Sequence, residues 1–258
     1  MVLHPDFWDV GGVVIKPWLV RPQRYLVGAV DFDGTNDYML RGAGLTGAAD
    51  GSQGTISFWF RLDGGDAATQ YFLANAADKV FVRRTAGNLI NIQAGPSTGG
   101  ALLNISTVAT YATSATWRHF LASWNLATAG ARFIYVGDVA DLTVTTFTNG
   151  TIDYTDTNWA IGATAAGASK LNGCLAELFF HTTYLDISVE ANRRKFIDAA
   201  LNPVNLGADG STPLGAQPLV YQRVADGAAA STFASNLGSG GNFTITGALD
   251  VASTSPSD

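Results

Sequence analysis

The segment TISFWFRL, residues 55–62, constrains the fold more than any other part of this chain. In an extended chain, successive side chains point to opposite faces, so every second residue lies on the same side. On one side of this segment every side chain is large and apolar, namely Ile56, Phe58, Phe60 and Leu62. This pattern predicts a half-buried antiparallel strand. Each of these side chains contributes about 1.5–3 kcal/mol on full burial, so together they can anchor one face of a sheet.

The preceding stretch, VDFDGTNDYML from Val30 to Leu40, combines short extended pieces with a tight turn. The turn is Asp33–Asp37, and its Gly, Asn and Asp residues favour turns because they tolerate unusual backbone angles and bond to nearby backbone groups. We therefore expect this turn at the rim or edge of a β-sandwich.

The composition supports an all-β fold and excludes several classes of protein. Of the 258 residues, 47% are hydrophobic and 14% are charged, which allows a large core and excludes global disorder. The 29 glycines suit many short strands joined by tight turns. The net charge of -6 includes no basic patch, so we expect no nucleic-acid binding. No apolar run is long enough to span a bilayer, so we expect no membrane insertion.

Further short extended segments predict a meander of antiparallel strands. Turn-forming residues at 75–78 and 85–88 separate the first of them. The segments are Gln70–Ala74, Lys79–Arg84, Leu89–Gln93, Trp117–Trp124 and Ala131–Asp138.

One short helix is predicted near residues 188–201. Ser188 is a suitable N-cap, and Glu190 in the first turn complements the helix dipole. The Asn202-Pro203 pair ends the helix. One stripe of the helix is apolar and consists of Val189, Phe196, Ile197, Ala200 and Leu201.

The chain divides into three parts. Residues 1–28 carry aromatic anchors and several prolines, and we expect an N-terminal arm or an added strand there. Residues 29–202 hold the sandwich. Residues 203–258 are rich in Gly, Ser and Thr and predict an appendage that packs on the sandwich or on a partner. Its last residues, Ser253–Asp258, are expected to be a mobile tail.

Five motifs occur in an order that resembles a laminin G-like or pentraxin-like domain of the concanavalin A-like lectin and glucanase superfamily. They are VDFDGTNDYML, GTISFWFRL, TWRHFLASWN followed by RFIYVGD, the Ile161-Gly162 pair, and LNGCLAEL at 171–178. Together they span residues 30 to about 200. The resemblance implies an all-β fold, an antiparallel β-sandwich of jelly-roll type, with one short helix toward its C-terminal side.

The resemblance also raises calcium as a ligand, since members that bind it use Asp and Asn side chains at the sandwich rim. The candidate ligands are Asp33, Asn36 and Asp37, with the turns 63–66 and 138–141 as further choices. Asp and Asn are equally the ordinary residues of turns, so a purely structural role is the alternative, and we expect no other cofactor.

A glycosidase needs two carboxyl groups facing each other across the scissile bond. Glucanases of the resembled superfamily carry these groups as a cluster on one strand, and this chain has no such cluster. Glu177 has no carboxylate neighbour in its strand, whose alternation places Leu175, Phe179 and His181 on the same face. We therefore predict that Glu177 is a hydrogen-bonded residue of the sheet and that the protein is not an enzyme.

The chain also lacks the elements of nucleophilic catalysis. Its histidines, His4, His119 and His181, are far apart in sequence and near no nucleophile motif, so we expect core or sheet-surface roles. Cys174 is the single cysteine, which excludes an intrachain disulfide, and its apolar strand predicts a small buried thiol.

A glycan-binding face is the remaining kind of site, because aromatic side chains and planar polar groups hold sugars. Four tryptophans could supply the aromatic face, namely Trp59, Trp117, Trp124 and Trp159. Trp59 is the best candidate, because it lies opposite the apolar side of its strand. The alternative is that the helix or the C-terminal appendage covers it.

A laminin G-like domain without a recognisable signal peptide or disulfide, and with arms at both ends, resembles a bacteriophage structural component. We expect a non-enzymatic virion surface protein made in the host cytoplasm, either a capsid decoration or a tail or fibre component. Its partners would be other virion subunits or itself, as a homo-oligomer, and its sandwich would bind surface glycans. The alternative is a free carbohydrate-binding lectin or adhesion module.

Overall fold

Strand β6 (Gln53–Leu62) lies in the middle of a twisted antiparallel sheet, between the long strands β11 (Ser114–Asn125) and β16 (Asn172–His181). The computed structural model describes residues 9–10, 13–14, 25–76 and 78–258. The predicted alternation of β6 is confirmed, because Ile56, Phe58 and Phe60 are buried in the main core. Trp59 points to the opposite side of the sheet and belongs to another cluster.

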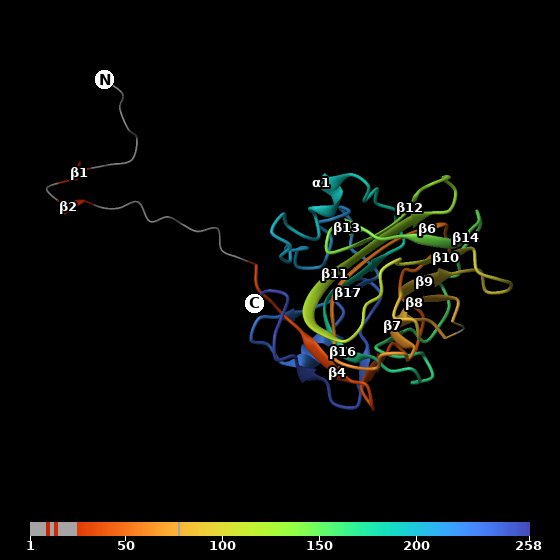
Figure 1. Ribbon diagram of the computed structural model, residues 1–258, viewed down its shortest axis with the longest axis horizontal. Coiled ribbons are helices and arrows are strands. Elements are labelled where there is room, and N and C mark those ends of the chain that lie inside the picture. Colours follow the sequence, from red (N-terminus) through yellow and green to blue (C-terminus); the bar gives the residue numbers. More distant parts are fainter. Residues whose placement is uncertain (1–8, 11–12, 15–24, 77) are drawn as a thin grey trace, which may run out of the picture.

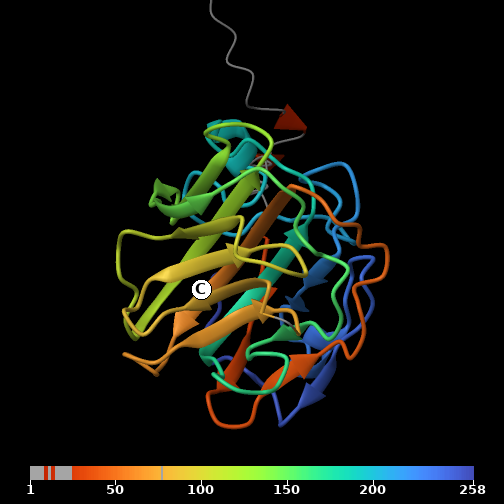
Figure 2. The ribbon, with the colours of Figure 1, turned by 90° about the vertical axis from the view of Figure 1, so that its right-hand side faces the viewer.

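Two sheets face each other and form the predicted β-sandwich (Figures 1 and 2). Sheet 1 contains, in spatial order, β14 (Thr143–Phe147), β10 (Leu103–Ser106), β9 (Ile90–Ala94), β8 (Val80–Arg84), β7 (Gln70–Ala74), β15 (Ala160–Ile161), β5 (Tyr38–Leu40) and β19 (Thr244–Thr246). Sheet 2 contains β13 (Val139–Ala140), β12 (Arg132–Val136), β11, β6, β16, β4 (Val30–Asp33) and β20 (Asp250–Val251), and β17 (Val220–Gln222) pairs with β16.

Aromatic side chains fill the space between the sheets. Phe58 of sheet 2 meets Phe72 of sheet 1 with ring centroids 4.8 Å apart, and Phe120 of β11 stacks beside it at 5.0 Å. Figure 2 shows strands β7–β9 in front of β11, β6 and β16, so these rings join the centres of the two layers. This core accounts for the large apolar fraction of the composition.

The predicted meander corresponds closely to the observed strands. Gln70–Ala74 forms β7 as predicted, and β8, β9 and β12 begin one residue later than the segments expected for them. Each of the pairs β7–β8, β8–β9 and β11–β12 is antiparallel.

The helix predicted near 188–201 is much shorter in the structure, and its predicted boundaries are wrong. The α-helix α1 spans Glu190–Arg193 only, and Val189 rather than Ser188 occupies its N-cap position, without a side-chain cap bond. Phe196 and Ile197 follow the end of the helix and are buried in different clusters.

Strand β16 departs from the alternation of side chains expected around Glu177, because the strand contains a bulge there. The register of β16 against β6 shifts between Ala176 and Phe179, and Glu177 has a positive φ of 51°. A bulge of this kind inserts a residue and reverses the faces beyond it. Leu175 therefore lies in the main core while Phe179 lies on the outer side, contrary to the prediction that they share a face.

The C-terminal residues after 203 add strands to the sandwich. Besides β17, β19 and β20, the short strand β18 (Val224–Ala225) pairs with β3 (Val27–Gly28), and a 3₁₀ helix spans Ala230–Ala234. The tail expected to be mobile, Ser253–Asp258, lies against β3, where the Val27 N–H donates to the buried Ser257 hydroxyl at 2.9 Å.

The N-terminal arm predicted at 1–28 lies largely outside the described residues. Its described parts are a two-stranded pair, β1 (Asp9–Val10) with β2 (Val13–Val14), and residues 25–28. Within the described part of the chain, no helix is both long enough and apolar enough to cross a membrane.

Candidate functional site

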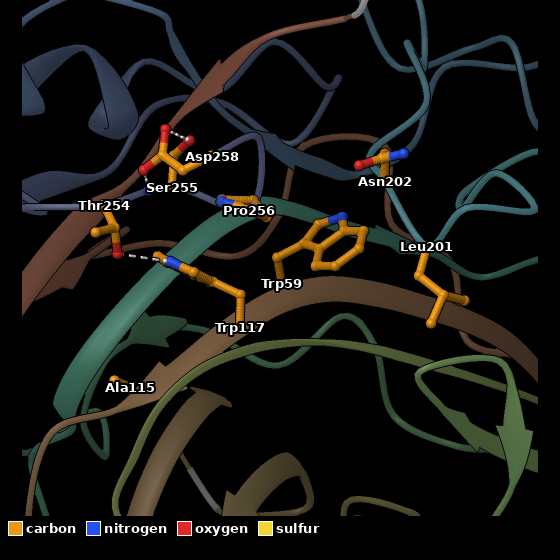
Figure 3. A pocket seen from close by; sticks show the side chains of 9 residues that line it. All are labelled: Trp59, Ala115, Trp117, Leu201, Asn202, Thr254, Ser255, Pro256 and Asp258. Atoms are coloured by element: carbon orange, nitrogen blue, oxygen red, sulfur yellow. Dashed lines mark hydrogen bonds between the residues drawn. The ribbon is translucent and has the colours of Figure 1, made fainter.

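A pocket of about 350 Å³ opens on the outer face of sheet 2, above strands β6 and β11 (Figure 3). We call it the Trp59/Trp117 pocket. Three parts of the chain that are distant in sequence build it: the sheet, the segment after α1, and the C-terminal segment 253–258. The lining residues are Trp59, Ala115, Trp117, Leu201, Asn202, Thr254, Ser255, Pro256 and Asp258.

Trp59 forms the base of the pocket. Its side chain is only 4% exposed, because Val27, Ala176 and Ile197 pack around it. The neighbouring ring of His119 on β11 has its centroid 4.9 Å away. Trp59 thus faces outward from the sheet, as the alternation predicts, but the chain around α1 and both terminal segments cover most of it, as in the alternative considered from the sequence.

Trp117 is the more accessible aromatic side chain of the pocket. It is half-buried, and Figure 3 shows it next to Trp59 on the sheet with its ring directed toward Thr254. The indole N–H donates to the Thr254 hydroxyl at 3.0 Å, and the Arg61 guanidinium lies 5.7 Å from the ring centroid. From the sequence, Trp117 is one of four tryptophans that could supply an aromatic face, and Trp59 is the preferred candidate. The irregular register of β11 between Ser114 and Arg118 sets its position.

Arg61 connects the sheet to the C-terminal segment. It forms a bidentate ion pair with Asp63, with both N–O distances at 2.8 Å. Its Nη1 donates to the Thr254 hydroxyl at 2.6 Å, and Nη2 donates to the Cys174 thiol at 3.1 Å. The hydrogen bond to Asp63 raises the pKa of Arg61, so the guanidinium is charged at every ordinary pH. Thr254 is thereby held beside Trp117.

The remaining lining residues are also fixed by local bonds. The Ser255 N–H donates to Asp258 Oδ2 at 2.6 Å, and Pro256 is buried between them. On the opposite side of the pocket, the Asn202 backbone N–H donates to Asp198 Oδ1 at 2.8 Å. Leu201 has a positive φ of 61° and turns its side chain, which is about half exposed, toward the pocket mouth.

Comparison with known proteins determines the family. A family model matches residues 33–186, more than half of the chain, and describes the concanavalin A-like lectin/glucanases superfamily. The chain belongs to this superfamily. The resemblance inferred from the sequence motifs is therefore confirmed at the level of the superfamily. No curated protein sequence matches the chain.

Several solved structures are similar to this superfamily member, and one of them has a TM-score above 0.5. A candidate carbohydrate-binding protein from Bacteroides ovatus has a TM-score of 0.63 at 14% identity, and the match covers 89% of this chain but 61% of that protein. The heptameric SAP-like pentraxin from Limulus polyphemus has a TM-score of 0.45 at 14% identity, with 62% and 77% covered. Domains LG4-5 of the mouse laminin α1 chain give 0.44 at 14%, with 66% and 48% covered.

The other tryptophans of this lectin/glucanase-type domain are core residues. Trp124 is buried and donates its indole N–H to the Tyr154 hydroxyl at 3.1 Å. Trp159 is buried and donates to the Asp156 carbonyl at 2.9 Å. Neither can present a face to a ligand.

Glu177 is a buried, hydrogen-bonded sheet residue, as predicted. The hydroxyls of Tyr25 and Tyr221 donate to its two carboxylate oxygens at 3.0 and 2.9 Å. Burial raises the pKa of Glu177 to about 7, and these hydrogen bonds and the charge of Arg223 oppose the rise. Its bonding partners in the described structure are phenols, so the second carboxylate that glycoside hydrolysis requires is not among them.

The described histidines and the cysteine lie in the sheet. His119 is buried, its Nε2 lies 2.8 Å from the Ser57 hydroxyl, and burial lowers its pKa to about 3, so it is neutral. His181 accepts a bond from the Thr183 N–H at 3.0 Å through Nδ1. Cys174 is buried as predicted, but its surroundings are polar, which corrects the apolar environment expected from its strand. His4 lies outside the described residues.

In the turn proposed for calcium, Asp33–Asp37, the carboxylates accept hydrogen bonds from backbone N–H groups of the protein. Asp33 Oδ1 accepts backbone N–H bonds from Thr35 at 2.7 Å and from Asn36 at 3.0 Å, and these bonds lower the pKa of Asp33. Asp37 Oδ1 accepts the Ala248 N–H at 2.8 Å, which ties the turn to the C-terminal region. These bonds match the structural alternative considered from the sequence.

Among the described residues, a different trio brings possible metal ligands within 4.8 Å of one another: Asp31, Asp63 and Cys174. Arg61 lies among them, since it bonds both Asp63 and Cys174. The Arg61 guanidinium and the Cys174 thiol already occupy oxygens of these carboxylates, so the arrangement gives no support for a metal ion.

Proposed function

We propose that this protein is a non-enzymatic carbohydrate-binding module and that the Trp59/Trp117 pocket is its ligand site. The observation that carries the proposal is the combination of a half-exposed indole with hydroxyl and carboxylate groups around one concave site. The C–H face of a sugar ring packs on an aromatic face, and its hydroxyls bond to a few fixed polar groups. The pocket offers both kinds of contact.

The superfamily and the fold support this proposal. A Bacteroides ovatus protein of the same fold is named as a candidate carbohydrate-binding protein, although this chain spans 61% of its length. The absence of a carboxylate partner for Glu177 among its described contacts favours binding over hydrolysis.

The test is binding of the purified full-length protein to a glycan array, followed by calorimetry with the best array ligand. Trp117→Ala should weaken binding about five- to thirtyfold, because the aromatic contact is worth about 1–2 kcal/mol. Tyr38→Ala is the matched control. Tyr38 is a half-buried aromatic under a cation, Lys170 at 5.6 Å, but it belongs to sheet 1. Equal losses in both variants would refute the assignment of the site.

A place on a bacteriophage particle remains a prediction. It is supported by the single cysteine, which forms no intrachain disulfide, and by the resemblance described above. Density-gradient sedimentation of the producing culture's lysate tests it. Hundreds of copies travelling with particles would indicate capsid decoration and a few copies a tail or fibre, whereas a small species at the top of the gradient would leave the free lectin module.

A homo-oligomer and calcium binding at Asp33, Asn36 and Asp37 also remain proposals. Sedimentation velocity of the full chain tests the first. For calcium, the bonds from backbone N–H groups to Asp33 and Asp37 already satisfy much of the carboxylate bonding capacity, so the structural role has the better support.

A further inference from the structure

The charges around the Trp59/Trp117 pocket distinguish between classes of glycan. Among the described residues that line it, Asp258 is the one with an ionisable side chain, and the others are neutral. Asp258 accepts two bonds from Ser255, one from the backbone N–H at 2.6 Å and one from the hydroxyl at 3.4 Å. A carboxylate can accept about four hydrogen bonds, so Asp258 retains capacity for the hydroxyls of a ligand.

Among the described residues, Arg61 is a cation beside the pocket, because it bonds Thr254 and lies over the Trp117 ring, and its bonding capacity is already used. A guanidinium has five N–H donors. Two of those of Arg61 go to Asp63, one to Cys174 and two to the hydroxyls of Thr254 and Ser253. The bidentate pair with Asp63 also neutralises its charge locally. Arg61 therefore shapes the pocket without offering a binding partner to an anion.

Further carboxylates lie on the same outer face of sheet 2. In the strand registers, Arg61 is opposite Cys174, Cys174 is opposite Asp31, and Asp31 is opposite Asp250. With Asp63, this row contributes three carboxylates against one guanidinium. The whole chain carries a net charge of -6, which adds to the negative potential that an approaching ligand meets.

From this arrangement we infer that the Trp59/Trp117 pocket takes neutral, hydroxyl-rich sugar rings and rejects sugars that carry a carboxylate, with Asp258 as a specificity-determining residue. This inference rests on the proposed function of the pocket. A neutral ring donates its hydroxyls to Asp258 and packs on Trp117. An acidic ring brings a second anion beside Asp258, and Arg61, the described cation beside Trp117, has no free donor for it. Such juxtaposition of like charges is unfavourable.

The experiment uses the full chain and matched pairs of glycans on one array, such as lactose with 3′-sialyllactose and galactose oligomers with galacturonic acid oligomers. We expect the neutral member of each pair to bind about tenfold or more tightly. Asp258→Asn should reduce this preference about fivefold, because it removes the side-chain charge and keeps an acceptor. Asp258→Lys should reduce it further.

Asp78→Asn is the control for the same change of charge, because Asp78 lies in the turn between β7 and β8 of sheet 1. Asp78→Asn should leave the preference for neutral glycans unchanged. Thermal unfolding of each variant verifies that it is folded.

The outcomes separate the inference from the proposed function. Preferential binding of acidic glycans that is lost in Trp117→Ala overturns the inference and leaves the proposed function standing. A preference that Asp258→Asn and Asp258→Lys do not alter overturns the role of Asp258. Binding to no glycan, or binding that Trp117→Ala does not weaken, overturns the proposed function and the inference with it.

Discussion

Replacing Glu177 by Gln should change how the stability of this protein depends on pH. Glu177 is buried in strand β16, next to the central strand β6, and is bonded to Tyr25 and Tyr221. Burial disfavours the ionised form in the folded protein and raises the pKa of Glu177 from 4.5 to about 7. The folded state therefore binds a proton more tightly than the unfolded state does. The stability from the protonated group is fully present below pH 4.5 and is lost as the pH rises to about 7.

The rise in pKa from 4.5 to about 7 corresponds to a loss of about 3 kcal/mol in the free energy of unfolding between pH 4.5 and pH 8, at about 1.36 kcal/mol for each pKa unit. Glu177→Gln removes the ionisation, so the variant should not show this loss. Its stability relative to the natural protein should rise by about 3 kcal/mol over the same range of pH.

Urea unfolding followed by tryptophan fluorescence at pH 4.5 and pH 8 measures the difference in the free energy of unfolding between Glu177→Gln and the natural protein. Glu190→Gln is the control, because the Glu190 side chain is 65% exposed and pairs with Arg194 one helical turn away. Such an exposed pair contributes little to stability. The difference in the free energy of unfolding between Glu190→Gln and the natural protein should therefore be nearly the same at both pH values. If Glu177→Gln also differs from the natural protein by the same amount at both pH values, the buried carboxyl does not titrate as we propose.

Three further results are expected. Phe58→Ala should lower the free energy of unfolding by about 3–5 kcal/mol in urea titrations, because it opens a cavity between the two sheets, and a loss below about 1 kcal/mol would contradict the core packing. Asp141→Ala should cost about 2–3 kcal/mol by the same assay, because it unpairs the Val108 N–H at 2.6 Å and the Tyr111 hydroxyl at 2.6 Å. Millimolar calcium should shift the melting temperature by less than about 2 °C, and a larger shift, abolished in Asp33→Ala, would establish the calcium site.

Much of the fold could be predicted, because its signals are local. The alternation in residues 55–62 reports directly which side chains face the core, and the turn residues after 74 and 84 set the ends of β7 and β8. The sequence did not predict where a strand departs from the two-residue alternation of its side chains. The bulge at Glu177 arises from pairing with β6, and a strand sequence does not mark the residue at which such pairing slips.

The helix was overestimated for a related reason. A stripe of apolar residues predicts a helix when all of them face one core. Here Phe196 packs against Phe179, whereas Ile197 joins the cluster around Trp59, so adjacent side chains are buried on different surfaces. Arg193 and Arg194 both pair with Asp138, the residue directly before β13, and these pairs hold the short helix α1 in place.

Local periodicity therefore established an all-β sandwich and the outward direction of Trp59, since both depend on the order of neighbouring residues. The pocket depends on positions 59, 117, 201 and 254, which approach one another only through strand pairing and the docking of the C-terminal segment. Those long-range contacts cover Trp59, leave Trp117 half-exposed and bring Asp258 to the pocket. Sequence spacing carries no information on them, because the distance between two residues in space is set by the register of the intervening strands.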